Sequence, residues 1–256
     1  MSETPATEMI LTGIEDGIRT VILNRPEALN AFRPEMLHAL RDVFRAAETD
    51  GETKVIVLEG AGRAFSAGVD LKVLQGVTPV AGKISGVFDE PAYEAATAIR
   101  QCSLPVIAKV HGACFTGALE IALHCDIIYT TADTKFGDTH AKFGIRPTWG
   151  MTQTLPRAVG MRRARELSFT ARTFLGKDAV SWGLANEACE NKEALDALVA
   201  ERASEIAANS SAVIAAYKDL HRVALENRSL EEAIAEEQAR EYPDITDTEE
   251  RLAGFR

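Results

Sequence analysis

The segment over residues 104–126, LPVIAKVHGACFTGALEIALHCD, constrains the fold most because it sets a charged residue among apolar ones. Its pattern predicts a buried strand, a loop with glycines, and a helix that begins at a glycine and carries Glu120. A carboxylate in such surroundings is costly unless it is paired or hydrogen-bonded. We therefore expect Glu120 to serve either the chemistry of a site or an ion pair with an arginine.

An earlier segment of the chain has the same plan. Residues 54–71, KVIVLEGAGRAFSAGVDL, also give an apolar strand, a loop with glycines and the start of a helix. Two such loops stacked side by side can direct two backbone N–H groups at one oxygen atom. The two segments together predict a site that stabilises an enolate or a tetrahedral oxyanion.

Composition limits the class of protein. With 256 residues, 46% hydrophobic and 26% charged, the chain can bury a full-sized core, as one large domain or one domain with an appendage. A net charge of −10 argues against a nucleic-acid or anionic-membrane partner. No stretch approaches the roughly 20 apolar residues of a membrane span, and the first residues lack a signal-peptide pattern. We expect a soluble, cytoplasmic protein.

The four cysteines are predicted to have no chemical role. Cys102, Cys114, Cys125 and Cys189 show no CxxC spacing and lie in apolar surroundings. This pattern favours reduced core residues over disulfides, metal ligands or nucleophiles. No metal site is therefore expected.

Periodicity and turn signals predict strands first and helices later. The predicted elements are a hairpin at 9–13 and 18–23, a helix from Pro34 to about 49, strands at 55–58, 105–110, 127–131 and 135–137, a short helix from Asp70, a helix from Asp89 to Arg100, and helices at 191–208, 211–227 and 230–240. Residues 76–86 predict a mobile loop that can act as a substrate lid. The last three helices predict an added layer that packs on the body or on another subunit.

Five motifs in order carry a resemblance to a known family. They are LNRPEALNAF (23–32), RAFSAGVDLKVL (63–74), HGACFTGALEIALHCDI (111–127), FGDTHAKFGIRP (136–147) and YPDITDTEERLAGF (242–255). Through them the chain resembles, over essentially its whole length, the crotonase or enoyl-CoA hydratase/isomerase superfamily.

The resemblance implies an α/β fold, a β/α superhelix of strand-strand-helix turns with a C-terminal helical region. It divides the chain into an acyl-CoA-binding core at residues 1–190 and a helical oligomerisation region at 191–256 that forms homotrimers or hexamers. It also implies a coenzyme A thioester as the substrate, with no cofactor, and a place in fatty acid metabolism.

Carried over onto this chain, the resemblance assigns the substrate-binding groups. The thioester oxygen would accept hydrogen bonds from the backbone N–H groups of Val69 and Gly117. Glycine at 117 fits because a side chain would obstruct the approach of the thioester to the backbone. Asp70 is also expected to cap the helix that follows it. The residues expected to contact the substrate are Ala28, Ala67, Gly68, Asp70 and Leu71.

The catalytic groups include a departure from the family pattern. Glu120 occupies the first catalytic glutamate position, on the same helix face as the Gly117 amide. At the second glutamate position of the family's hydratases this chain has His140. Histidine exchanges protons near neutral pH, and a neighbouring Glu120 would hold it charged. The alternatives are that His140 only hydrogen-bonds the backbone, and that Asp138 is the second acid.

Two further features concern the substrate. Where many of the family's hydratases have small residues, this chain has Trp149 and Met151, which either reshape the acyl pocket or simply pack in the core. The phosphates of coenzyme A require local cations, and motif position points to Arg25, Lys72 and Lys218.

The predicted activity is that of an enoyl-CoA hydratase, a lyase that adds water across the 2,3 double bond by means of Glu120 and His140. The same pair is competent for a hydrolase that cleaves a C–C bond or the thioester. An isomerase that moves the double bond needs only one group that shuttles a proton. A non-catalytic acyl-CoA-binding protein is the remaining alternative.

Overall fold

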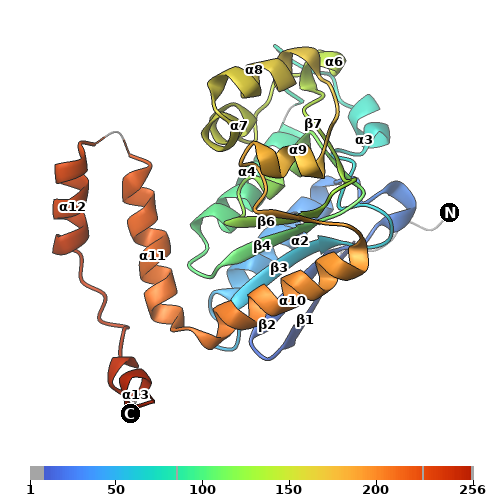
Figure 1. The fold of residues 1–256 in the computed structure, drawn as a ribbon. Coiled ribbons are helices and arrows are strands. Elements are labelled where there is room, and N and C mark those ends of the chain that lie inside the picture. Colours follow the sequence, from blue (N-terminus) through green and yellow to red (C-terminus); the bar gives the residue numbers. More distant parts are fainter. Residues whose placement is uncertain (1–8, 85, 227, 255–256) are drawn as a thin grey trace.

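Residues 9–84, 86–226 and 228–254 are described by a computed structural model (Figure 1). Residues 1–8 and 255–256 lie outside the described part. They are the outer ends of the predicted regions 1–190 and 191–256, and position 255 is also the last residue of the fifth motif. Position 85, in the predicted loop at 76–86, and position 227, at the end of a predicted helix, lie outside it as well.

A six-stranded sheet in the order β1-β2-β3-β4-β6-β9 carries the fold. Its strands are β1 (Ile10–Glu15), β2 (Ile18–Leu23), β3 (Val55–Gly60), β4 (Val106–Val110), β6 (Ile127–Thr131) and β9 (Glu187–Cys189). The pair β1 and β2 is antiparallel, which confirms the predicted hairpin, and the other neighbours are parallel. Parallel strands place their carboxyl ends along one edge, where the loops that follow them meet.

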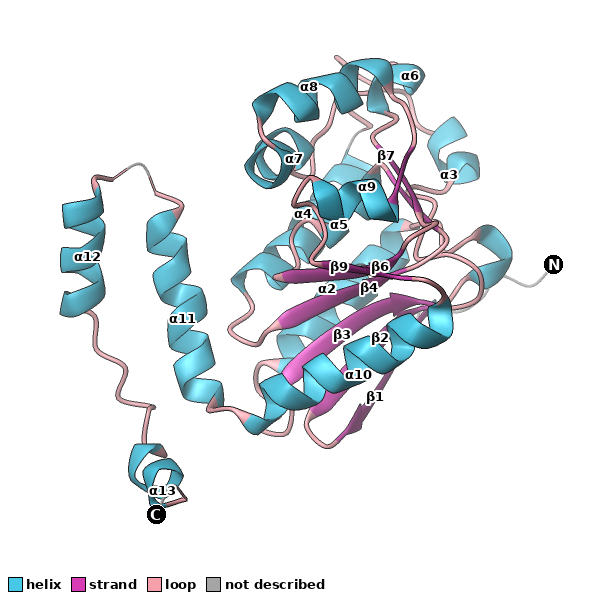
Figure 2. Cartoon of the chain, viewed as in Figure 1, coloured by secondary structure: helices cyan, strands magenta, loops and turns pink. Residues whose placement is uncertain are grey.

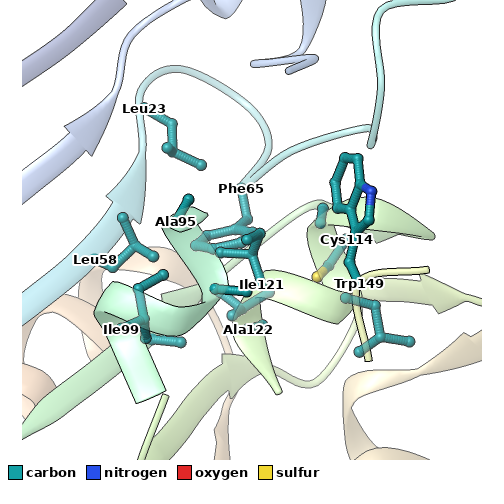
Figure 3. Close-up of a cluster of buried hydrophobic side chains, with 14 of the residues drawn as sticks. Leu23, Leu58, Phe65, Ala95, Ile99, Cys114, Ile121, Ala122 and Trp149 are labelled. Carbon is teal, nitrogen blue, oxygen red and sulfur yellow. The ribbon is translucent and has the colours of Figure 1, made fainter. Parts of the chain in front are cut away.

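The central strands are buried on both faces (Figure 2). On one face lie the helices α2 (Pro34–Ala47), α4 (Gly86–Gln101) and α5 (Gly117–Ala122), and on the other lies α10 (Lys192–Ala208). Ile56 and Leu58 point into the main core, whereas Val55 and Val57 pack against α10. This alternation follows from the two-residue period of a strand. Figure 3 shows labelled side chains of β3, α4 and α5 meeting in the main core.

A small second sheet lies above the first, in the order β5-β7-β8. Its strands are β5 (Ala113–Phe115), β7 (Lys135–Gly137) and β8 (Phe174–Leu175). The succession β4, β5, α5 is one strand-strand-helix turn, and β6, β7, α6 is the next, with α6 at His140–Phe143. The strand β5 was not predicted, because its residues fall within the loop with glycines that was expected between the buried strand and the Glu120 helix.

The remaining helices of the described chain complete the body or form its C-terminal part. They are η1 (Pro26–Ala28), α3 (Leu71–Gln75), α7 (Met151–Val159), α8 (Met161–Thr170), α9 (Gly176–Ser181), α11 (Ser211–Ala224), α12 (Leu230–Ala239) and α13 (Thr248–Ala253). The short helix α6 follows Asp138 and Thr139 after the end of β7. Among the described residues, no helix combines the length and the apolar character that crossing a membrane requires.

The C-terminal helices differ in how they meet the body. Leu195 and Val199 of α10 are buried against the sheet. In contrast, α11, α12 and α13 extend away from it (Figure 1), and α11 is joined to the body where Lys218 Nζ contacts Asp126 Oδ2 at 2.6 Å. The division of the chain at residue 191 into a core and an oligomerisation region stays a prediction. The first helix of the second region, α10, packs against β3 and so contributes to the core of the body.

The contact of α10 with the sheet is tested by Leu195→Ala. Leu195 is fully buried, so its truncation is expected to lower the free energy of unfolding by about 2–5 kcal/mol in the cooperative transition of the body. Urea denaturation followed by circular dichroism measures this. Glu201→Ala, an exposed change on the same helix, should alter the value by no more than about 0.5 kcal/mol. A separate early transition that leaves the body intact would assign α10 to an independent unit.

Candidate active site

A cavity of about 340 Å³ lies where the two loops with glycines meet the chain around α6 and α7. Its walls contain most of the residues that the sequence assigns to a site: Ala67, Val69, Leu71, Gly117, Glu120 and His140. Ala28, Gly68 and Asp70 do not line it. The rest of the wall is largely apolar, as a site for an acyl group requires.

The two loops run side by side, as predicted. Ser66 N–H donates to Ala113 O at 3.0 Å, and Phe115 N–H donates to Ser66 O at 3.3 Å. Gly68 has φ of +95°, and a Cβ atom there would lie 2.8 Å from Phe115 O and 3.7 Å from Gly117 N. Gly68 therefore permits the close approach that brings Val69 and Gly117 together, although it lies behind the wall of the cavity.

The backbone N–H groups of Val69 and Gly117 are available to a ligand. Hydrogen bonds hold the chain on either side of Val69: Phe32 N–H donates to Gly68 O at 2.7 Å and Asp70 N–H to Phe32 O at 2.9 Å. Within the described part of the chain, no acceptor binds the N–H of Val69 or of Gly117. Since backbone donors are rarely left unpaired, two such groups on one cavity wall favour an oxygen ligand.

Thr116 sets the direction in which the chain enters α5. It has φ of +51° and ψ of −109°, an unfavourable conformation for a β-branched residue. Thr116 N–H donates to Gly137 O at 2.8 Å, and its hydroxyl contacts that of Thr139. These contacts hold the strained residue next to the amide of Gly117. Sequence reasoning missed this residue, since neither composition nor spacing marks a threonine at positive φ.

Glu120 is 1% exposed and is anchored by main-chain groups. Its Oε1 accepts hydrogen bonds from Trp149 N–H at 3.1 Å and Met151 N–H at 3.0 Å. Its Oε2 lies 3.4 Å from His140 Nε2. No arginine of the described chain pairs with it, so the alternative of an arginine ion pair is wrong. The carboxylate is instead held by α7 and the residues before it.

His140 connects Glu120 with a second buried carboxylate. His140 Nδ1 donates to Asp138 Oδ1 at 2.7 Å, and Ser168 Oγ donates to Asp138 Oδ2 at 2.7 Å. Ser168, Asp138, His140 and Glu120 thus form one chain of contacts. The alternative that His140 only binds backbone is wrong, because both ring nitrogens face carboxylates. Asp138 lies behind His140 and does not line the cavity.

The two carboxylates favour the charged form of the histidine. Burial lowers the pKa of His140, but the hydrogen bonds and charges of Asp138 and Glu120 outweigh it and raise the pKa to about 9. Burial also acts to raise the pKa of Asp138, but hydrogen bonds from His140 and Ser168 bring it below its usual range. Both shifts favour the charged form of His140 at neutral pH.

The side chain of Trp149 explains why residue 117 is a glycine, which the sequence did not reveal. A Cβ at Gly117 would lie 2.4 Å from Trp149 Cζ3, so the indole ring requires a glycine there whatever the substrate. Trp149 and Met151 are buried in the main core, and Trp149 also forms part of the cavity wall. The prediction of core packing is confirmed for both, and the bulk of Trp149 limits the space beside Gly117.

Arg25 and Asp70 hold the fold of the first loop. Arg25 Nη2 pairs with Asp70 Oδ2 at 2.9 Å, and Asp70 Oδ1 accepts from Lys72 N–H at 3.0 Å, which confirms Asp70 as the cap of α3. Arg25 is therefore engaged inside the protein rather than at the cavity. Lys218 is likewise paired with Asp126, and neither residue lines the cavity. Neither cation supports the predicted phosphate contacts, and Lys72 is exposed.

Part of the predicted lid belongs to the wall of the cavity. Ile84 is 5% exposed and lines it, and Arg146 N–H donates to Gly82 O at 2.9 Å. This segment is thus tied to the chain after α6.

As to metals, the described residues contain no cluster of three or more histidine, cysteine or acidic side chains that can bind an ion.

Comparisons with known proteins show what the chain is similar to in sequence and in fold. The sequence profile of the enoyl-CoA hydratase/isomerase family matches residues 13–255. The chain is 32% identical to a short-chain-enoyl-CoA hydratase of Clostridium acetobutylicum over 78% of this chain and 76% of that protein. It is also 32% identical to a peroxisomal Delta(3,5)-Delta(2,4)-dienoyl-CoA isomerase of Arabidopsis thaliana over 77% and 74%. The crystal structure of an enoyl-CoA hydratase from Bacillus anthracis matches with a TM-score of 0.89 at 27% identity, covering 96% of this chain and 95% of that one, which confirms the α/β fold.

The charge of His140 should make stability depend on pH. A histidine whose pKa rises from about 6.5 in the unfolded chain to about 9 in the native protein contributes stability that is complete below pH 6.5. That contribution is lost as the pH rises through 9. The free energy of unfolding of the wild type should therefore fall between pH 6.5 and 9.5 relative to that of His140→Gln. A difference between the two proteins that stays constant over this range would refute the charged state.

Proposed function

The chain belongs to the enoyl-CoA hydratase/isomerase family, and from this premise we propose that it is an enoyl-CoA hydratase, which adds water across the 2,3 double bond of an acyl-CoA thioester. One observation carries the proposal. Two unpaired backbone N–H groups, of Val69 and Gly117, line the same cavity as the contact between Glu120 and His140. The relative in Clostridium acetobutylicum is named a hydratase.

The two amides act on the thioester oxygen. When water adds at C3, the electron pair of the double bond moves toward the thioester, and negative charge develops on its oxygen. Val69 and Gly117 stabilise this charge, and each such donor lowers the barrier by about 3 kcal/mol. Because the loops are fixed by their own hydrogen bonds, the donors need no rearrangement during the reaction.

Glu120 and His140 divide the proton transfers. Glu120 takes a proton from the attacking water, while its other oxygen stays bound to Trp149 and Met151 N–H. His140, as a cation, gives its Nε2 proton to C2. The products are the hydrated thioester, protonated Glu120 and neutral His140. A proton passed across the 3.4 Å from Glu120 to His140 restores the starting state.

An isomerase is the second candidate, because a relative at 32% identity is named a dienoyl-CoA isomerase. Moving a double bond requires a proton to leave one carbon and return to another, which Glu120 alone can perform. A hydrolase on the same site would direct the water at the thioester or at a ketone carbon instead. A non-catalytic acyl-CoA-binding protein would use the oxyanion hole without turnover.

We also propose that residues 191–256 mediate a homotrimer or hexamer. Among the described residues, α12 has no buried side chain, and its Leu230 and Ile234 are exposed together with Tyr217 of α11 and Leu252 of α13. Apolar side chains on an extended helical arm favour contact with another subunit. A cytoplasmic location stays a prediction from the sequence.

The main test uses crotonyl-CoA with Glu120→Gln. The wild type should consume the absorbance of the enoyl thioester without releasing free thiol. The variant keeps the shape of the side chain but loses the base, so kcat should fall about a thousandfold or more while the Kd for ligand stays within about tenfold. Glu187→Gln, an exposed change on β9, should leave the rate unchanged. Wild-type turnover in Glu120→Gln would remove that carboxylate from the mechanism.

His140→Ala separates the activities. A hydratase loses its proton donor, so hydration of crotonyl-CoA should fall about a hundredfold or more. Isomerisation of a 3-enoyl thioester through Glu120 should survive. An unchanged hydration rate would exclude His140 from the mechanism, and thiol release by the wild type would support the hydrolase.

A further inference from the structure

Asp138 is a buried carboxylate for which the hydration steps give no role. It is 1% exposed, directly follows β7, and lies on the side of His140 away from the cavity. We propose that Asp138 is a positioning residue, which fixes the ring of His140 and keeps both ring nitrogens as donors, so that the Nε2 proton faces Glu120 and the substrate. Its effect on turnover rests on the proposed function, whereas its effect on His140 does not.

The contacts of Asp138 identify it as an ionised acceptor. Its Oδ1 accepts from His140 N–H at 3.2 Å and from His140 Nδ1 at 2.7 Å, and its Oδ2 accepts from Ser168 Oγ at 2.7 Å. Three donors converge on one buried carboxylate, which compensates for its removal from water. Because the donors come from α6 and α8, the carboxylate is fixed between two helices.

The ring of His140 has an acceptor on each side. An ionised carboxylate has no proton to give, and a neutral imidazole has a hydrogen on only one nitrogen. A neutral ring would thus place a lone pair against Asp138 at 2.7 Å or against Glu120 at 3.4 Å. With both carboxylates ionised, only the imidazolium satisfies both contacts. The pKa of His140, raised to about 9, agrees with this geometry.

Other charged groups around His140 do not supply this effect. Lys142 and Arg146 line the same cavity, but both are exposed and of the same sign as the imidazolium. On α8, which packs against α6, Arg163 lies over the ring of Trp182, and Glu166 pairs with Arg172 at 3.0 Å. The carboxylates that act on the ring are therefore Asp138 and Glu120.

This arrangement assigns opposite tasks to two neighbouring groups. Glu120 stays free to take a proton because His140 already carries one. Without Asp138, the ring can become neutral at physiological pH and can rotate, and then Nε2 accepts a proton instead of giving one. Asp138 therefore acts on the reaction through His140 and does not contact the substrate.

The test compares Asp138→Asn with the wild type by a titration of His140 in NMR spectra. The His140 signal is identified by its loss in His140→Gln. In Asp138→Asn the titration midpoint should fall by about 1 pH unit or more, because a charged partner has become neutral. The basic limb of the pH profile for kcat should shift by the same amount. At pH 7.5, kcat should fall about tenfold or more with KM within about threefold.

Asp133→Asn is the matched control. It removes the same charge five positions away, at an exposed carboxylate that accepts from Thr131 Oγ1 at 2.7 Å. The His140 midpoint and the rate should both stay as in the wild type.

The titration decides the proposal in every case. An unchanged His140 midpoint in Asp138→Asn would overturn it. If that variant does not fold, the wild type alone is decisive, since a midpoint below pH 7, or only one protonated ring nitrogen at pH 7.5, would also overturn it. If the wild type does not hydrate crotonyl-CoA, the proposed function fails while the titration still tests Asp138.

Discussion

The close contact between the Gly68 loop and the chain before α5 is the constraint on which the rest of the site depends. Two hydrogen bonds of Ser66 set the two loops in register, and the missing side chain at Gly68 lets them approach. The amides of Val69 and Gly117 then fall on one cavity wall. With Thr116 held in a strained conformation just before Gly117, the donors are fixed before any substrate arrives.

Buried charge is the second constraint, and it is balanced locally. Glu120 and Asp138 share one imidazolium, and each carboxylate has further donors: two backbone amides for Glu120 and a hydroxyl for Asp138. Such a network stabilises the fold only while every member is satisfied. The network lies beside the amides of Val69 and Gly117 on the same cavity, which distinguishes it from an ion pair with a structural role alone. The contacts that favour a charged His140 are therefore present in the folded chain without any substrate.

Much of this site follows from the sequence, and the remainder follows only from tertiary contacts. An acidic residue in an apolar helix marked Glu120, and repeated strand-glycine-helix segments marked the loops of Val69 and Gly117. The dependence of Gly117 on Trp149, the strain at Thr116 and the place of Asp138 behind His140 were not predictable, because each arises from segments that meet only in the folded chain. Arg25 was misread for the same reason, since its partner Asp70 lies on another loop.

Trp149 has two separable functions in one residue. Its main chain anchors the site, since its N–H binds Glu120 and its carbonyl accepts from His124 Nε2 at 2.7 Å. Its side chain packs in the main core, shapes the wall and requires a glycine at position 117. Peptide groups are common to all residues except proline, so the anchors of the base do not depend on the indole, whereas the shape of the wall does. A smaller ring at this position would therefore widen the acyl space at a cost in core packing, while the peptide groups that hold Glu120 stay in place.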